Sequence, residues 1–185
     1  MEVVDRAVEV LKAGGVVASP TDTVYGLLAD ATNEEAVKRV YELKCRPSAK
    51  PLLVLVDDMQ MAKELAYIPD EIEHLVHRYW FSEDRPTTVV LKAKNANKLV
   101  VAGSETIAIR RPNHSLILNI LKRLQRPLVA PSANMHGNSP CTSYGMVKSV
   151  FGDNLELVID GGDSKDTSPS TIIDLSADQI RTIRQ

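Results

Sequence analysis

The chain has 185 residues, of which 44% are hydrophobic and 25% are charged, so it can bury one sizeable core. A net charge of −2 and an aromatic content of 4% argue against a dedicated nucleic-acid-binding protein. No apolar run approaches the roughly 20 residues that span a bilayer, and two cysteines are too few for a disulfide framework. We therefore expect one cytoplasmic domain, residues 1–185, that does not enter a membrane.

Helical periodicity and strand-like runs alternate along most of the chain. Val4 to Leu11 repeats with helical spacing up to Gly14-Gly15, and Asn33 is a favourable N-cap for a helix that runs to about Lys44. Further helices are expected at Met59–Ala66, Asp70–Tyr79 and Asn113–Arg123, and from the cap Thr142 to Val150. Strands are expected at Val16–Ser19, Leu52–Val56, Thr87–Leu91, Thr106–Arg110, Pro127–Ala130, Leu155–Ile159, Ser170–Asp174 and Ile180–Ile183. This order, with its strand-rich end, predicts an α/β fold with a twisted mixed sheet flanked by helices.

Four polar segments interrupt this pattern, three of them at a predicted strand end, where α/β sheets commonly bind ligands. They are Ser19–Leu27, Lys44–Lys50, Pro131–Pro140 and Pro169–Thr171. Their hydroxyls, amides and one carboxylate could line a crevice. The alternative is that the same groups only satisfy backbone donors in turns.

The second segment carries Lys44, Arg46 and Lys50 without an acid from Leu43 to Val56, so a small anionic ligand is indicated. Three cations in seven residues could grip a triphosphate, with the arginine as a fork. The alternative is that Lys44 complements the helix dipole while the other two are solvated.

The residues alone do not define a reaction. Neither a phosphate-binding loop of the G-x-x-x-x-G-K-[ST] type nor a G-x-G-x-x-G fingerprint occurs. His74 and His77 are three residues apart on a predicted helix, but further ligands are missing, so a solvated face is expected and no metal site is predicted. No partner activates Cys45 or Cys141, and they receive no role.

Five segments taken together, and in order, resemble the YrdC-like family. They read GGVVASPTDTVYGL from Gly14, AVKRVYELKCRPSAKPLL from Ala36, IAIRRPNH from Ile107, VAPSANMHGNSPCT from Val129 and DGGDSKDTSPSTIID from Asp160. The resemblance covers nearly the whole chain, and it implies a twisted α/β fold around a large, positively lined central cavity. It is closest to the short form, because the longer form carries a further C-terminal domain.

The resemblance also implies an activity. Family members condense L-threonine, bicarbonate and ATP, with Mg²⁺, into threonylcarbamoyl-AMP and pyrophosphate. A separate complex then transfers the threonylcarbamoyl group to tRNA, and tRNA itself is a further candidate partner. By position, a catalytic tetrad around the nucleotide falls on Lys44, Arg46, Ser132 and Asn134. The ATP site also takes in Lys50, Thr88, Ser139 and Arg184, and the threonine site falls on Thr21, Thr23, Arg110 and Ser170.

The chain departs from the family pattern in four places, and two alternatives stay open. The segment Trp80–Thr88 is longer and more acidic than the usual W-P-G-P-L-T, Leu28 replaces a common glycine, and His136 replaces a common serine. The final Arg184 also lacks the usual Pro-Gly after it. One alternative is an RNA-binding module of the same fold, because a basic concave surface can hold a phosphate backbone. The other is a paralogue that acts on another ligand.

Overall fold

The computed structural model of the chain describes residues 2–81, 85–164, 168–177 and 179–184. The helices are α1 Glu2–Lys12, α2 Glu34–Lys44, α3 Met59–Leu65, α4 Asp70–Trp80, α5 Lys98–Val101, α6 Ser115–Leu124 and α7 Tyr144–Phe151, which continues into a 3₁₀ turn at Gly152–Asn154. The strands are β1 Val17–Ser19, β2 Gly26–Asp30, β3 Leu53–Leu55, β4 Thr87–Lys92, β5 Thr106–Arg110, β6 Leu128–Val129, β7 Leu157–Val158, β8 Thr171–Asp174 and β9 Arg181–Arg184.

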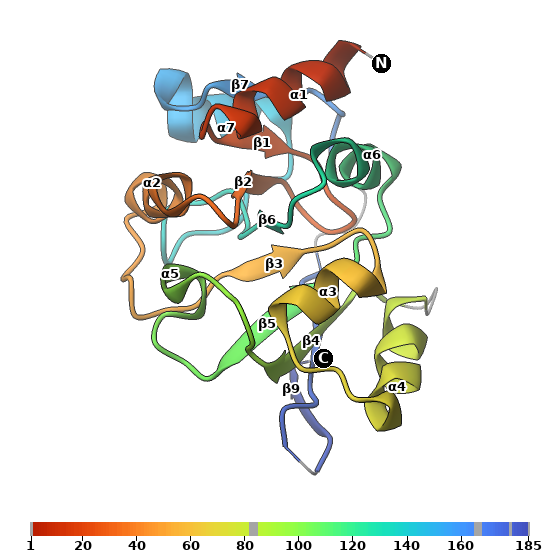
Figure 1. Cartoon of the computed structure of the whole chain (residues 1–185). Coiled ribbons are helices and arrows are strands. Elements are labelled where there is room, and N and C mark those ends of the chain that lie inside the picture. Colours follow the sequence, from red (N-terminus) through yellow and green to blue (C-terminus); the bar gives the residue numbers. More distant parts are fainter. Residues whose placement is uncertain (1, 82–84, 165–167, 178, 185) are drawn as a thin grey trace.

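The strands form one twisted mixed sheet in the order β7-β1-β2-β6-β3-β5-β4-β8-β9 (Figure 1). Three pairs are parallel, namely β1 with β7, β3 with β5 and β4 with β8, and the other neighbours are antiparallel. The predicted α/β class with a mixed sheet is therefore confirmed. Strand β2 lies outside the predicted strands, because its first residues, Gly26 and Leu27, fall in the segment interpreted as polar. Residues 26–28 pair with Val17–Ser19 in an antiparallel register, and this pairing with β1 brings the polar segment Pro20–Tyr25 into a connecting loop.

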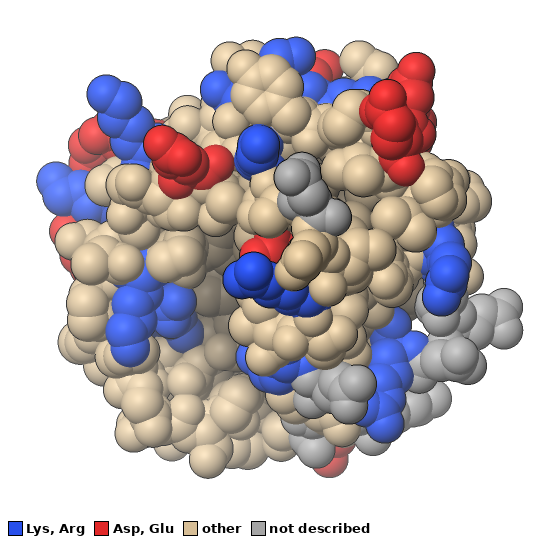
Figure 2. Space-filling model, turned by 90° about the horizontal axis from the view of Figure 1, so that it is seen from below, with Lys and Arg blue, Asp and Glu red and all other residues tan. Residues whose placement is uncertain are grey.

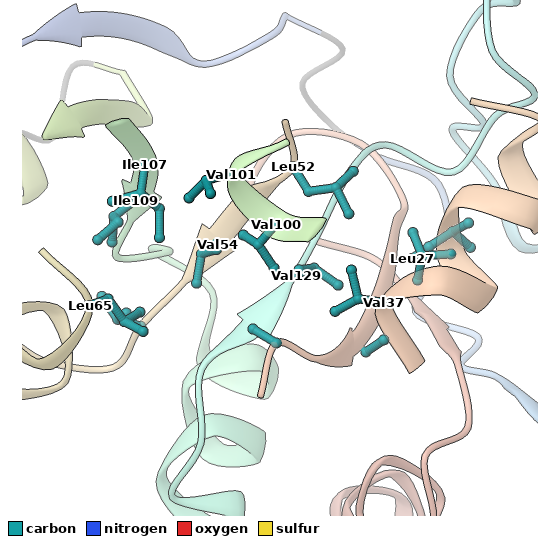
Figure 3. Close-up of a cluster of buried hydrophobic side chains, with 14 of the residues drawn as sticks. Leu27, Val37, Leu52, Val54, Leu65, Val100, Val101, Ile107, Ile109 and Val129 are labelled. Atoms are coloured by element: carbon teal, nitrogen blue, oxygen red, sulfur yellow. The ribbon is translucent and has the colours of Figure 1, made fainter. Parts of the chain in front are cut away.

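Two hydrophobic clusters lie on opposite faces of the sheet. The larger one joins α2, α3 and α5 to strand residues such as Leu27, Val54 and Ile109, as Figure 3 shows. The smaller one joins α1 and α6 to Val17, Leu28 and Leu128. Because strand side chains alternate between faces, neighbours such as Leu27 and Leu28 serve different clusters. Helices α1 and α6 pack on each other over β1, β2 and β6, and they leave the β5-β4-β8 end of that face uncovered.

Local capping explains where several helices begin. The Asn33 side chain accepts a hydrogen bond from the Ala36 amide at 3.2 Å, as predicted for the N-cap of α2. The prediction that Thr142 caps the last predicted helix is wrong by one residue, because the Ser143 side chain accepts from the Met146 amide instead. Within the described residues, no helix has the length and apolar content that crossing a membrane requires.

Candidate functional site

A cavity of about 570 Å³ opens where the sheet face is left uncovered, and its size is that of a small-molecule site. The strand residues that line it include Leu53, Thr88, Ala108 and Ile172. Each alternates with a core residue of the larger cluster, Ile109 beside Ala108 being one example. The period of two along the strands thus turns one set of side chains into the core and the other into the cavity. The face seen in Figure 2 is hollowed, with basic side chains on both sides of the hollow.

The cavity is positively lined, as the family resemblance implies. Arg46, Arg110 and Arg184 contribute to its wall, and among the described residues no Asp or Glu does. These arginines come from the loop after α2, from the end of β5 and from the end of β9. A guanidinium is always charged at neutral pH and binds carboxylates and phosphates through two parallel hydrogen bonds. The cavity is therefore suited to a ligand with more than one anionic group.

One end of the cavity is built on a buried ion pair. Arg110 Nη2 lies 3.3 Å from Asp22 Oδ1, and the two side chains are 4% and 7% exposed. Asp22 Oδ2 also accepts from the Asn113 amide at 3.1 Å, which ties the loop after β1 to the turn after β5. Among the described residues, Arg110 Nε has no hydrogen-bond partner. Burial lowers the pKa of Arg110, Asp22 opposes this effect and Arg184 adds to it. Arg110 thus lines the cavity with a buried guanidinium whose donors are not all used by the protein.

A hydroxyl cluster lies on the neighbouring strands. Thr88 Oγ1 and Ser170 Oγ are 2.9 Å apart and buried. Arg184 donates from Nε and Nη2 to the Ser170 carbonyl at 3.0 and 2.8 Å, which fixes the edge strand β9 against the entry of β8. Thr21 Oγ1 donates to the Val24 carbonyl at 2.7 Å and accepts from the Thr23 amide at 3.1 Å. Thr21 therefore satisfies backbone groups in a turn, which was one of the two interpretations of this segment, and it also lines the cavity.

The fully buried ammonium of Lys44 organises the segment after β6. Lys44 is 2% exposed, and its Nζ donates to the carbonyl oxygens of Ser132 and Asn134 and to Asn134 Oδ1. Ser132 Oγ donates to the same Asn134 Oδ1 at 2.7 Å. Burial and the nearby Arg46 charge lower the pKa of Lys44 to about 8. The three residues form one hydrogen-bonded unit, of which only Ser132 lines the cavity.

The end of α2 directs Arg46 to the cavity wall. Cys45 adopts a left-handed conformation with φ of 48°, and the Arg46 amide donates to the Tyr41 carbonyl. Arg46 Nη2 then donates to the Pro51 carbonyl at 3.0 Å. Lys50 is exposed, with its Nζ 3.0 Å from His136 Nε2. Desolvation lowers the pKa of His136, and the nearby charges of Lys50, Arg46 and Lys44 lower it further.

Eight of the twelve predicted site residues line the cavity. They are Thr21, Thr23, Arg46, Thr88, Arg110, Ser132, Ser170 and Arg184. The other four, Lys44, Lys50, Asn134 and Ser139, are not part of its wall, so direct contact between them and a ligand stays a prediction. Of the atypical segment Trp80–Thr88, residues 82–84 lie outside the described residues, as do residues 165–167 of the Asp160–Asp174 segment.

Two residues of the site were not predicted from the sequence. Asp22 is the carboxylate of the Ser19–Leu27 segment, for which a crevice and a turn were both open, and its pairing with Arg110 depends on a contact 88 positions away that no local pattern reveals. Tyr25 is buried, and its hydroxyl donates to the Gly162 carbonyl at 2.8 Å and accepts from the Gly161 amide. It therefore ties the Asp160-Gly161-Gly162 turn to the cavity. The described part of the chain contains no group of three His, Cys, Asp or Glu side chains placed to hold a metal ion.

The sequence is similar to one family of proteins over nearly its whole length. The profile of the Sua5/YciO/YrdC family, described as telomere recombination, matches residues 9–185. A threonylcarbamoyl-AMP synthase of Pyrococcus abyssi is 39% identical over 168 residues, which are 90% of this chain and 48% of that protein. A threonylcarbamoyl-AMP synthase of Vibrio vulnificus is 30% identical over 176 residues, and the match covers 95% of both chains. The chain thus spans about half the length of its P. abyssi relative and nearly all of its V. vulnificus relative.

Structure comparison gives the same grouping. The crystal structure of P. abyssi Sua5 complexed with L-threonine superposes with a TM-score of 0.91 at 37% identity, over 98% of this chain and 53% of that one. Escherichia coli YciO superposes with a TM-score of 0.88 at 21% identity, over 100% of this chain and 89% of that one. At that identity the likeness to YciO concerns the fold alone.

Proposed function

The chain belongs to the Sua5/YciO/YrdC family, and from this membership we propose that it is an L-threonylcarbamoyladenylate synthase. Its substrates would be L-threonine, bicarbonate and ATP, with Mg²⁺ entering as the companion of ATP. The observation that carries the proposal is the cavity that brings Arg46, Arg110 and Arg184 together with a set of hydroxyl groups. Such a wall can hold a carboxylate and a polyphosphate at the same time.

The two ends of the cavity suit the two larger substrates. Arg110, whose buried Nε has no partner in the described part of the chain, would pair with the threonine carboxylate, while Thr23 and Ser170 would face the polar side chain and amine. The nucleotide would lie toward Arg46 and the Ser132–Asn134 segment. The P. abyssi relative whose structure is described as complexed with L-threonine supports the threonine assignment. Lys50, Ser139 and Arg184 remain proposed contributors to the phosphate side.

The chemistry needs placement more than a side-chain nucleophile. The threonine amine attacks bicarbonate and gives a carbamate and water. A carbamate oxygen then attacks the α-phosphorus of ATP, the bond to the β-phosphate oxygen breaks, and pyrophosphate leaves. Fixed guanidinium groups would stabilise the charge that develops on the phosphates, because they need no reorganisation during the reaction. Holding carbamate and ATP in contact replaces an encounter in solution.

The fate of the product belongs to the same proposal. Threonylcarbamoyl-AMP is a mixed anhydride, so a second protein must consume it before water does. A tRNA threonylcarbamoyl-transfer complex is the proposed consumer, and tRNA itself is a further candidate partner. A cytoplasmic location would fit this role and stays a prediction.

A product assay tests the proposal. Purified protein is incubated with MgATP, L-threonine and ¹³C-bicarbonate, and threonylcarbamoyl-AMP is sought at once by mass spectrometry. We expect product only when all three substrates are present. Arg46→Ala should abolish most of it with an unchanged melting temperature, whereas the exposed Arg6→Ala, on α1, should behave as wild type. ATP binding without product would contradict the reaction and favour another acceptor, and a protein that binds RNA but not ATP would favour the RNA-binding alternative.

A further inference from the structure

Lys44 occupies a place that does not suit a phosphate-binding lysine. A lysine that grips a triphosphate presents its ammonium to the cavity, but Lys44 is 2% exposed and is not part of the cavity wall. A protonated lysine has three N–H donors. All three acceptors around Nζ belong to the protein, namely the Ser132 and Asn134 carbonyls and Asn134 Oδ1, the latter two at 2.9 and 3.0 Å. No donor is left for a nucleotide.

The backbone of Lys44 is bonded to the same segment. Its carbonyl accepts from the His136 amide at 2.7 Å. The C-terminal turn of α2 therefore holds residues 132–136 through both its side chain and its main chain. Ala133 is held separately, because its amide donates to the Tyr25 carbonyl at 2.7 Å and its carbonyl accepts from the Cys141 amide at 2.8 Å, so Lys44 acts mainly on the groups of Ser132 and Asn134 to either side of it.

The lysine also sets the direction of the hydrogen bonds that follow. Asn134 Nδ2 donates to the carbonyls of Met135 and Asn138 at 3.1 and 2.7 Å, so its Oδ1 faces the ammonium and the amide has one sensible orientation. Ser132 then donates its proton to Oδ1 at 2.7 Å. Ser132 Oγ is left with its lone pairs, so it presents an acceptor to the cavity that Ser132 lines.

We propose that Lys44 is a positioning residue, which acts on the nucleotide through the Ser132–Asn134 segment and does not touch a phosphate. This inference rests on the proposed nucleotide site, and it assigns Lys44 a role different from that of Arg46. Replacing the ammonium by an apolar group would leave the Asn134 carbonyl without its donor, while the Ser132 carbonyl would keep only the Asn134 amide and Asn134 Oδ1 would keep only Ser132 Oγ. The segment would then move or bind water, and the groups that it shows to the cavity would lose their placement.

A double-mutant cycle on ATP affinity separates positioning from direct contact. Lys44→Met and Asn134→Ala are each expected to weaken ATP binding roughly tenfold to hundredfold, because each breaks charge-assisted hydrogen bonds. Since both act on one unit, the double variant should bind within about twofold of the weaker single variant. In the parallel cycle of Arg46→Ala with Asn134→Ala, where Arg46 lies in the wall, the two effects should multiply. Lys38→Met, exposed on the same helix, should bind as wild type.

Threonine affinity is the control measurement, because a general loss of structure would weaken threonine binding together with ATP binding. Lys44→Met should keep threonine binding within about twofold of wild type, because the Arg110 end is built without Lys44. If Lys44→Met does not fold, Lys44→Gln, which retains two donors, carries the same cycle. Multiplying effects of Lys44 and Asn134, an unchanged ATP affinity, or equal loss of ATP and threonine binding would each overturn the positioning role. Wild-type protein that binds no ATP would instead contradict the nucleotide site itself.

Discussion

The buried pair between Asp22 and Arg110 gives the sharpest quantitative prediction. Asp22→Asn removes the negative charge but keeps a side-chain oxygen for the Asn113 amide. Arg110, 3% exposed, then remains as a buried cation without a counter-charge. Breaking such a pair by changing one partner costs about 3 to 5 kcal/mol, and the retained hydrogen bond favours the lower end, about 3 kcal/mol. At about 2 to 4 °C per kcal/mol for a chain of this size, the melting temperature should fall by roughly 6 to 12 °C.

Two further measurements of the melting temperature test whether the uncompensated charge of Arg110 causes this loss of stability. The double variant Asp22→Asn/Arg110→Met removes both charges and should recover most of the lost melting temperature, because no uncompensated cation remains. Saturating L-threonine should raise the melting temperature of Asp22→Asn more than that of wild type, since its carboxylate supplies the missing charge to Arg110. A melting temperature of Asp22→Asn within 2 °C of wild type, measured by calorimetry, would refute the claim that this pair holds the end of the cavity.

Three further predictions concern the nucleotide side and the turn beside it. Arg46→Ala should weaken ATP binding at least tenfold in calorimetric titration without lowering the melting temperature, because within the described residues Arg46 bonds only to the nearby Lys50 and Pro51 carbonyls. ATP affinity of the wild type should fall as the pH rises through about 8, the pKa of Lys44, because the neutral amine has only two donors, and Lys44→Met should lose this step. Gly161→Ala should cost about 1 to 3 kcal/mol of stability, since the new Cβ would lie 2.5 Å from Pro20 Cγ. Gly145→Ala is the matched control, because none of the described residues has an atom within 4 Å of the Cβ added there, and equal melting temperatures of the two variants would contradict this packing argument.

Much of the fold follows from local patterns in the sequence. Spacings such as Val4 to Leu11 identify helices, and β-branched runs such as Thr87–Leu91 identify strands, because burial of one face imposes the period. Strand β2 was missed since its first residues adjoin a polar loop and its length shows only through pairing with β1 and β6. The short helix α5 at Lys98–Val101 was missed because four residues carry no periodicity.

The residues of the site also divide into those that the sequence could place and those whose role depends on long-range contacts. Ser132 could be placed because it follows a predicted strand, where ligand sites form in α/β folds, and Arg46 because it belongs to a cluster of cations without an acid. Arg110 was placed through the family resemblance alone. The role of Lys44 could not, because a lysine at the end of a helix has the same sequence signature whether its ammonium faces a ligand or a buried carbonyl. That difference depends on where the segment after β6 returns, which is a long-range property of the sheet.

Release of pyrophosphate tests the central claim most directly. Wild-type protein with MgATP, L-threonine and bicarbonate should release pyrophosphate, and omission of threonine or bicarbonate should reduce the rate to background. Arg110→Met should require far more threonine for the same rate, because it removes the proposed partner of the carboxylate. Release of orthophosphate instead, or pyrophosphate release that is independent of threonine, would contradict the proposal that this cavity joins threonine and ATP.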